Sequence, residues 1–378
     1  MLNENKLELA GFNPAQLTFA RTRRGIKKGE LAKRIGVSLR SITGYESREF
    51  PPEPERLIKI SEELKFPVEF FYEEESIDEV DPEAVSFRAM SKMSATLKNV
   101  ALGAGSVALR INSWIEERFQ LPPPDLPDMG GDMTPEAAAE SLRQHWGLGE
   151  QPIRNMTYLL EAKGVRVFSL AIDAKEVDAF SMWWNGTPFV FLNTQKSAEH
   201  SRFDAAHELG HLIMHRHGQP HGVEAEKEAN SFASAFLMPA KSIHASRLHF
   251  PTLDSLIMAK KHWAVSVSAL NYRLHSLNLT SEWINRSLCI QIAKAGYRTD
   301  EPQGVARETS QVLEKVFAAL RVEGLGKSDM ARDLRLTTYE IDELTYGLLK
   351  IGAVPDRGEK ERIVSVEKRP SPALSIVK

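Results

Sequence analysis

Residues 205–215 of this 378-residue chain carry a metal-binding pattern, Ala-Ala-His-Glu-Leu-Gly-His-Leu-Ile-Met-His. In a helix, residues four apart lie on one face, so His207 and His211 can hold one metal ion between them. Glu208 can then reach a water molecule at an open position of that ion without being a ligand. A zinc hydrolase needs these groups and a third ligand. A buried helix with two hydrogen-bonded histidines is the alternative, which a third ligand would disfavour.

A third ligand is available in residues 223–239, which read as a helix stopped by Pro239. Apolar residues recur there at helical spacing and define a buried face. Glu226 falls within this face, where an acid is costly unless it is paired or bound to metal. Glu228 falls outside it, toward solvent, and is the second choice. Asn230 also points inward and could accept the free N–H of a ligand histidine. A solvated run of glutamates at a helix start is the competing interpretation.

Peptide hydrolysis also needs a donor for the oxyanion that forms on the substrate carbonyl. His215, one turn after His211, is the first candidate, and His217 and His221 follow in the next loop. A role in packing or in holding a ligand is an equal alternative for His215. We therefore assign Glu208 and His215 to catalysis, His207, His211 and Glu226 to the metal, and Asn230 to the support of a ligand. Zn is the expected ion, and imidazole and carboxylate ligands are also compatible with Mn.

His-Glu-Leu-Gly-His at 207–211, followed by Glu-Lys-Glu-Ala-Asn-Ser-Phe-Ala-Ser-Ala-Phe-Leu-Met-Pro at 226–239, resembles the ImmA/IrrE family of metallopeptidases. The resemblance covers roughly residues 150–280. It implies a zincin-like fold and a peptidase that cleaves helix-turn-helix repressors of bacteria and phages.

The N-terminal 14–72 segment has the order of a helix-turn-helix unit. Short helices are expected over 16–25, 30–37, 39–46 and 54–64, with a turn at Gly36 and an N-cap at Ser38. Leu31-Ala32, Ile35-Gly36-Val37-Ser38, Ile42 and Tyr45-Glu46 resemble the Cro/repressor-type (XRE) DNA-binding domain. Ser47 and Arg48 stand where that family often has a glycine.

Basic residues are concentrated between 21 and 40, where Glu30 is the only acid. Such a cluster suits phosphate contacts, which supply affinity but not sequence choice. Base contacts would come from exposed residues at the start of the second helix of the motif. The residues that we assign to DNA are Arg24, Lys28, Ser38, Arg40, Ser41 and Thr43. A solvated basic face on a protein-docking module is the alternative.

Composition indicates an ordinary globular protein, with 42% apolar and 26% charged residues and a formal net charge of −3. The single Cys289 suggests a reducing compartment. We find no signal-peptide order at the start and no apolar run long enough to span a membrane. We therefore expect a cytoplasmic protein.

The expected fold is mainly α with a small β-sheet. Its parts are a helix-turn-helix domain (1–75), a linker with a long helix (76–131), an α+β zincin-like domain (132–290), and a C-terminal helical region with a tail (291–378). The long helix, 93–119, could pair with a second copy in a homodimer. Strands are expected at 165–170 and 187–193, and the second could pair with a substrate peptide. The acidic run from residue 73 reads as a solvated linker.

Two functions compete at this stage. One is a DNA-binding regulator with a metal-dependent endopeptidase domain that cleaves a repressor protein and so induces genes. The other is a regulator whose protease-like domain senses metal, a ligand or a partner without turnover. Self-cleavage near residues 121–131 is a weaker third interpretation. The intact Glu208 favours the enzyme, because a sensor has no need of the base.

Overall fold

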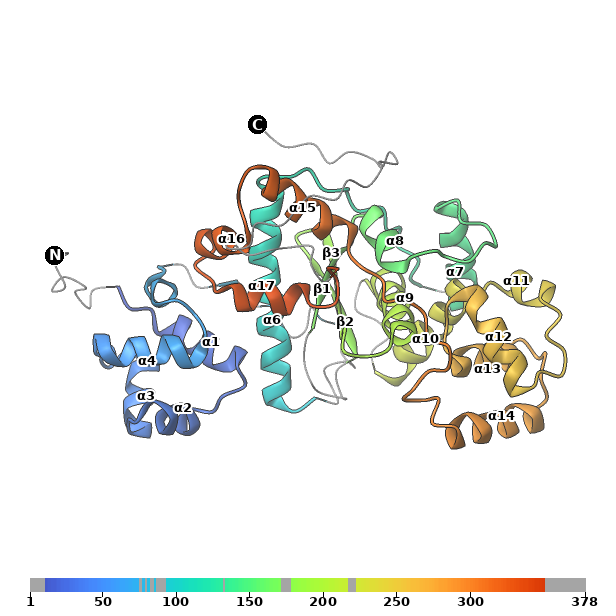
Figure 1. Cartoon of the computed structure of the whole chain (residues 1–378), viewed down its shortest axis with the longest axis horizontal. Helices are drawn as coiled ribbons and strands as arrows, with labels where there is room; N and C mark the ends of the chain where they lie inside the picture. The colour runs from blue at the N-terminus through green and yellow to red at the C-terminus, as the bar shows by residue number, and fades with distance from the viewer. Residues whose placement is uncertain are drawn as a thin grey trace, which may run out of the picture.

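The computed structural model describes residues 11–74, 77–78, 80–81, 85, 93–131, 133–170, 178–216 and 222–350. As expected, the fold is mainly helical with one small sheet (Figure 1). No helix in this described part is long and apolar enough to cross a membrane.

The N-terminal unit consists of four helices and a short 3-10 turn. These are α1 (Pro14–Arg23), α2 (Lys28–Ile35), α3 (Leu39–Glu46), α4 (Pro54–Leu64) and η1 (Val68–Tyr72). Gly36 ends α2 with a left-handed φ of 70°, and the Ser38 hydroxyl accepts the Ser41 N–H at the start of α3. Because glycine adopts that conformation at little cost and serine caps a helix, this turn follows directly from the local sequence.

One long helix, α6 (Ala95–Glu116), stands between the N-terminal unit and the sheet (Figure 1). The last described helices, α15 (Gln311–Val322), α16 (Lys327–Asp333) and α17 (Thr338–Thr345), return to lie beside it. Trp114 of α6 donates its indole N–H to Asp333 at 3.3 Å. The first described helix, α1, and the last, α17, therefore both contact α6.

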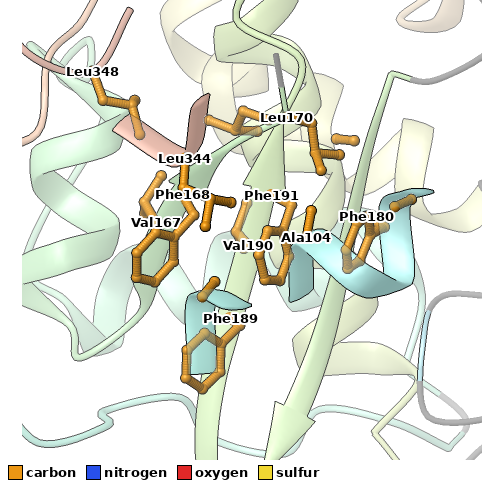
Figure 2. Packing of buried hydrophobic residues seen from close by; sticks show 14 of the residues in the cluster. Ala104, Val167, Phe168, Leu170, Phe180, Phe189, Val190, Phe191, Leu344 and Leu348 are labelled. Carbon is orange, nitrogen blue, oxygen red and sulfur yellow. The ribbon is translucent and has the colours of Figure 1, made fainter. Parts of the chain in front are cut away.

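The sheet has three strands, β1 (Arg166–Ser169), β2 (Ala179–Trp184) and β3 (Thr187–Leu192), in the order β1-β3-β2. β3 pairs in parallel with β1 and antiparallel with β2. Phenylalanines from all three strands stack on one face, where Ala104 of α6 and Leu344 of α17 cover them (Figure 2). The other face packs against α9 (Ala198–Met214), which Ser181 and Trp183 of β2 contact.

The expected 187–193 strand is therefore central, with a partner on each side, and it cannot take a substrate strand. The edge strands are β1 and β2, and our sequence analysis did not predict β2. Its outer edge is bridged antiparallel at Met182 by Val85. The acidic run is also not fully solvated, because Glu73 is buried and pairs with Arg110 of α6.

Helices make up the rest of the peptidase-like region. They are α7 (Pro135–His145), α8 (Met156–Ala162), α9 (Ala198–Met214), α10 (Val223–Leu237), α11 (Ala240–Ala245), α12 (Leu253–Trp263), α13 (Val267–Ser276) and α14 (Glu282–Lys294). Ser197 caps α9, and α10 ends just before Pro239, as expected. Gly210 lies against α10, where an added Cβ would stand 3.0 Å from Phe232 and 3.3 Å from the Ala229 Cα. The absence of a side chain at Gly210 lets α10 pack closely against α9.

Candidate metal centre and DNA-binding surface

Helices α9 and α10 bring the three expected ligands together. The two Nε2 atoms of His207 and His211 lie 3.1 Å apart. The Glu226 carboxylate lies 3.6 Å from Nε2 of His207 and 3.4 Å from Nε2 of His211. Ligand atoms around a tetrahedral zinc, at about 2.0–2.1 Å from the ion, stand about 3.3–3.4 Å apart. The spacing of these donors fits such an ion.

The outer hydrogen bonds of the two histidines fix which nitrogen carries the proton. Nδ1 of His207 lies 3.1 Å from Oδ1 of Asn230, which can only accept, so this nitrogen is the donor. Its Nε2 therefore presents a lone pair to the centre. Burial, and next the neighbouring His211, lower the pKa of His207 to about 4. The neutral imidazole that a metal requires is thus the form present at pH 7.

His215 lies on the side of the His211 ring opposite to His207. Its Nε2 is 2.9 Å from a carboxylate oxygen of Glu228, and its Nδ1 is 2.9 Å from Nδ1 of His211. Because Glu228 only accepts, His215 donates to it and accepts the Nδ1–H of His211. His211 then presents its Nε2 lone pair toward His207. Two lone pairs facing each other at 3.1 Å repel unless a cation lies between them, which also fits a metal site.

Glu208 lies between the metal helix and the sheet. It is 2% exposed, and the hydroxyl of Ser181 on β2 donates to its carboxylate at 2.6 Å. A second side chain of β2, Trp183, donates its indole N–H to the Leu212 carbonyl on the same helix at 3.2 Å. The edge strand β2 therefore runs alongside α9 and holds the Glu208 carboxylate.

The exposed residues that we expect to face DNA lie at the start of α3. Leu39 is 56% exposed, and Arg40 and Thr43 are also exposed. Ser38 and Ser41 bond each other through their hydroxyls at 2.9 Å, so both help to cap the helix. Arg40 is the side chain here with the reach and the charge for a base edge or a phosphate.

Arg24, which the sequence analysis assigned to DNA, is engaged within the fold. Its side chain is 10% exposed, pairs with Glu340 of α17 at 2.5 Å and donates to the Leu64 carbonyl at 2.7 Å. Arg23 pairs with the same Glu340 at 3.1 Å. Lys28 is partly withdrawn too, since its ammonium lies 2.9 Å from Glu46. The basic cluster is thus largely neutralised by acids distant in sequence.

Residues 160–275 match the family model of the IrrE N-terminal-like domain. The chain therefore carries an IrrE-like peptidase domain. That family is one of metallopeptidases, which accords with the His207, His211 and Glu226 cluster. Residues 19–71 match the helix-turn-helix family model, which supports DNA binding by the N-terminal unit. The comparison with curated proteins finds no match. The chain thus joins a helix-turn-helix domain to a peptidase-like domain.

Sequence reasoning missed two contributors to the IrrE-like domain, Ser181 and the strand that carries it. A usable signal was present in Asn185-Gly186, which separates two apolar runs. Both residues have positive φ, 47° and 77°, as in a two-residue hairpin turn. His217 and His221, the alternative oxyanion donors, lie outside the described residues.

Proposed function

We propose that this protein is a DNA-binding transcription regulator whose IrrE-like domain is a metal-dependent endopeptidase that cleaves a repressor protein. The observation that carries the proposal is the convergence of two imidazoles and one carboxylate beside the buried carboxylate of Glu208. A structural role alone would not place four such groups together, since each is costly to bury.

The donor set suits a divalent ion such as zinc, with manganese as the alternative. When bound, the ion would supply Lewis acidity toward the scissile carbonyl and toward a water molecule. His207, His211 and Glu226 would hold it. Asn230 and His215 would keep the two imidazoles in the required tautomer, as partners of metal ligands commonly do. We therefore favour the supporting role of His215 over the oxyanion role.

Glu208 would be the general base. It follows a ligand directly in sequence, so it can approach a reacting water without occupying a coordination position. The Ser181 hydroxyl donates to its carboxylate and fixes its orientation. Glu208 would take the proton from the attacking water and pass it to the departing amine.

The helix-turn-helix domain would hold the peptidase near its site of action on duplex DNA. Cleavage of a repressor there would induce transcription. Self-cleavage at residues 121–131 is disfavoured, because the backbone of this segment is engaged. The backbone N–H of Asp125 donates to the Lys163 carbonyl at 2.9 Å, and the backbone N–H of Met129 donates to the Ile213 carbonyl at 3.0 Å.

The deciding experiment compares the parent with Glu208→Gln, both loaded with zinc or manganese, against repressors encoded near its own gene. The variant should retain metal, fold and DNA binding, and its cleavage rate should fall by about 10²–10⁴-fold. Glu224→Gln, on an exposed part of α10, is the matched control. If Glu208→Gln still responds to the inducing signal as the parent does, the peptidase is not needed and the sensor function takes its place.

A further inference from the structure

Asp204 is an acidic residue of α9 that is not one of the three candidate metal ligands. It lies three residues before His207 and four before Glu208, so it shares their side of the helix. Its Oδ2 atom is buried and has no hydrogen-bond partner within the described residues. Buried polar atoms in native proteins are nearly always bonded, and an exception calls for an explanation.

The surroundings of Asp204 do not supply that explanation. The cation that acts on its carboxyl group is Lys196, just before α9, and the Lys196 ammonium contacts Asp178, the residue before β2. Burial, opposed by Lys196 and reinforced by Glu208, raises the pKa of Asp204 to about 7. The protein therefore holds a poorly compensated carboxyl group close to its candidate catalytic base. Unfavourable placement of this kind is common where a ligand completes the site.

The position of Asp204 relates it to a bound peptide. One helical turn, about 5.4 Å along the axis, separates it from Glu208. An extended peptide advances about 3.3 Å per residue, so one or two residues cover the same length. β2 runs alongside α9, with Ser181 at Glu208 and Trp183 at Leu212. An extended peptide that lies along α9 beside Glu208 passes Asp204 within two residues of the bond attacked there.

We propose that Asp204 is a specificity-determining residue that accepts the side chain of a lysine or arginine within two residues of the scissile bond. This inference rests on the proposed peptidase function and names its substrate class, a protein segment with a basic residue next to the cleavage point. A guanidinium or ammonium group would give Oδ2 a charged hydrogen-bond partner, which none of the described residues gives it.

The test uses the metal-loaded full chain and quenched fluorescent decapeptides that carry Lys, Gln or Glu at each position in turn. At one position near the cleaved bond, the parent should prefer Lys over Gln by about 10-fold or more in kcat/KM. Asp204→Asn should reduce that preference to about twofold and leave the Gln peptide nearly unaffected. Asp204→Lys should shift the preference toward Glu, and Asp254→Asn, an exposed acid of α12, should change nothing. An equal loss on all peptides in Asp204→Asn would overturn the inference.

A binding measurement separates this inference from the proposed function. In the Glu208→Gln variant, the Lys peptide should have a dissociation constant about 10-fold lower than that of the Gln peptide. Fluorescence anisotropy measures both constants. Adding Asp204→Asn should abolish the difference. If the parent cleaves no peptide while this preference is present, peptide hydrolysis fails and basic-segment recognition stands. Equal binding of the Lys and Gln peptides overturns the recognition by Asp204, whether or not the parent cleaves.

Discussion

Nδ1 of His215 lies 2.9 Å from Nδ1 of His211, the ring nitrogen of His211 that faces away from Glu226. With the 2.9 Å contact from His215 to Glu228, this makes a hydrogen-bonded chain from a carboxylate to a candidate ligand. Burial keeps the pKa of His215 below its usual range, so the imidazole of His215 is neutral at pH 7. Such a chain sets the orientation of His211 and raises its basicity toward a metal.

His215→Ala should lower metal affinity by about 10–100-fold, because His211 loses the group that holds its tautomer. Competition with a chromophoric chelator measures the change. Glu224→Gln should leave the affinity as it is. A variant that binds metal like the parent and fails only in cleavage would restore the oxyanion role for His215.

Glu226→Gln should lose the metal, whereas Glu228→Gln should retain it with an affinity lower by about 10-fold. The first change removes a donor from the cluster, and the second only weakens the hydrogen bond that supports His215. Elemental analysis of the two purified variants distinguishes these outcomes. Equal metal content in both would show that the carboxylate of Glu226 is not a ligand.

Local periodicity was sufficient to predict much of the site. The spacing of His207 and His211 and the apolar stripe around Glu226 depend only on helical geometry, which a sequence carries directly. The turn at Gly36 and the cap at Ser38 were predictable for the same reason. The grouping of the three expected ligands accords with the prediction, because both helices have strongly patterned faces.

Contacts between distant segments were not predictable in this way. Arg24 was assigned to DNA because Glu30 is the only acid nearby in sequence, yet Glu340 reaches Arg24 from more than 300 positions away. Ser181 meets Glu208 only because β2 is an edge strand beside α9. The helical wheel places Glu228 toward solvent, but it could not show that the His215 ring of another helix would contact its carboxylate.

DNA binding by the full chain should show a modest salt dependence. Of the eight basic residues between 21 and 40, five have a carboxylate partner, namely Arg21, Arg23, Arg24, Lys28 and Arg34. The other three, Lys27, Lys33 and Arg40, would give a slope of log K against log salt near −3 per chain, whereas eight contacts would give about −7. Fluorescence anisotropy with a labelled duplex over a salt series measures this slope.

Single substitutions should locate those phosphate contacts. Lys33→Ala should reduce the magnitude of the salt slope by about one, and Arg24→Ala should leave it unchanged. Arg40→Ala should weaken a specific site more than random DNA. A slope near −7, or a loss of about one in Arg24→Ala, would mean that the pairs with Glu340 and the other acids open on DNA.

Asp204→Asn should stabilise the metal-free protein, and the gain should depend on pH in a defined direction. The folded protein raises the pKa of Asp204 from 3.8 to about 7, so between these values the folded state binds a proton that the unfolded state has released. Stability from this group is therefore complete below pH 4 and is lost as pH rises to about 7. Asparagine has no such loss. The gain in the free energy of unfolding of Asp204→Asn over the parent should therefore be absent at pH 4 and largest above pH 7, on the order of 1–4 kcal/mol. Calorimetry of the parent and the variant in a chelating buffer, over a series of pH values, measures this difference.

Glu161, whose pKa burial also raises to about 7, is present in both proteins and cancels in the difference. An advantage that does not change with pH would mean that Asp204 is not a buried, poorly compensated acid.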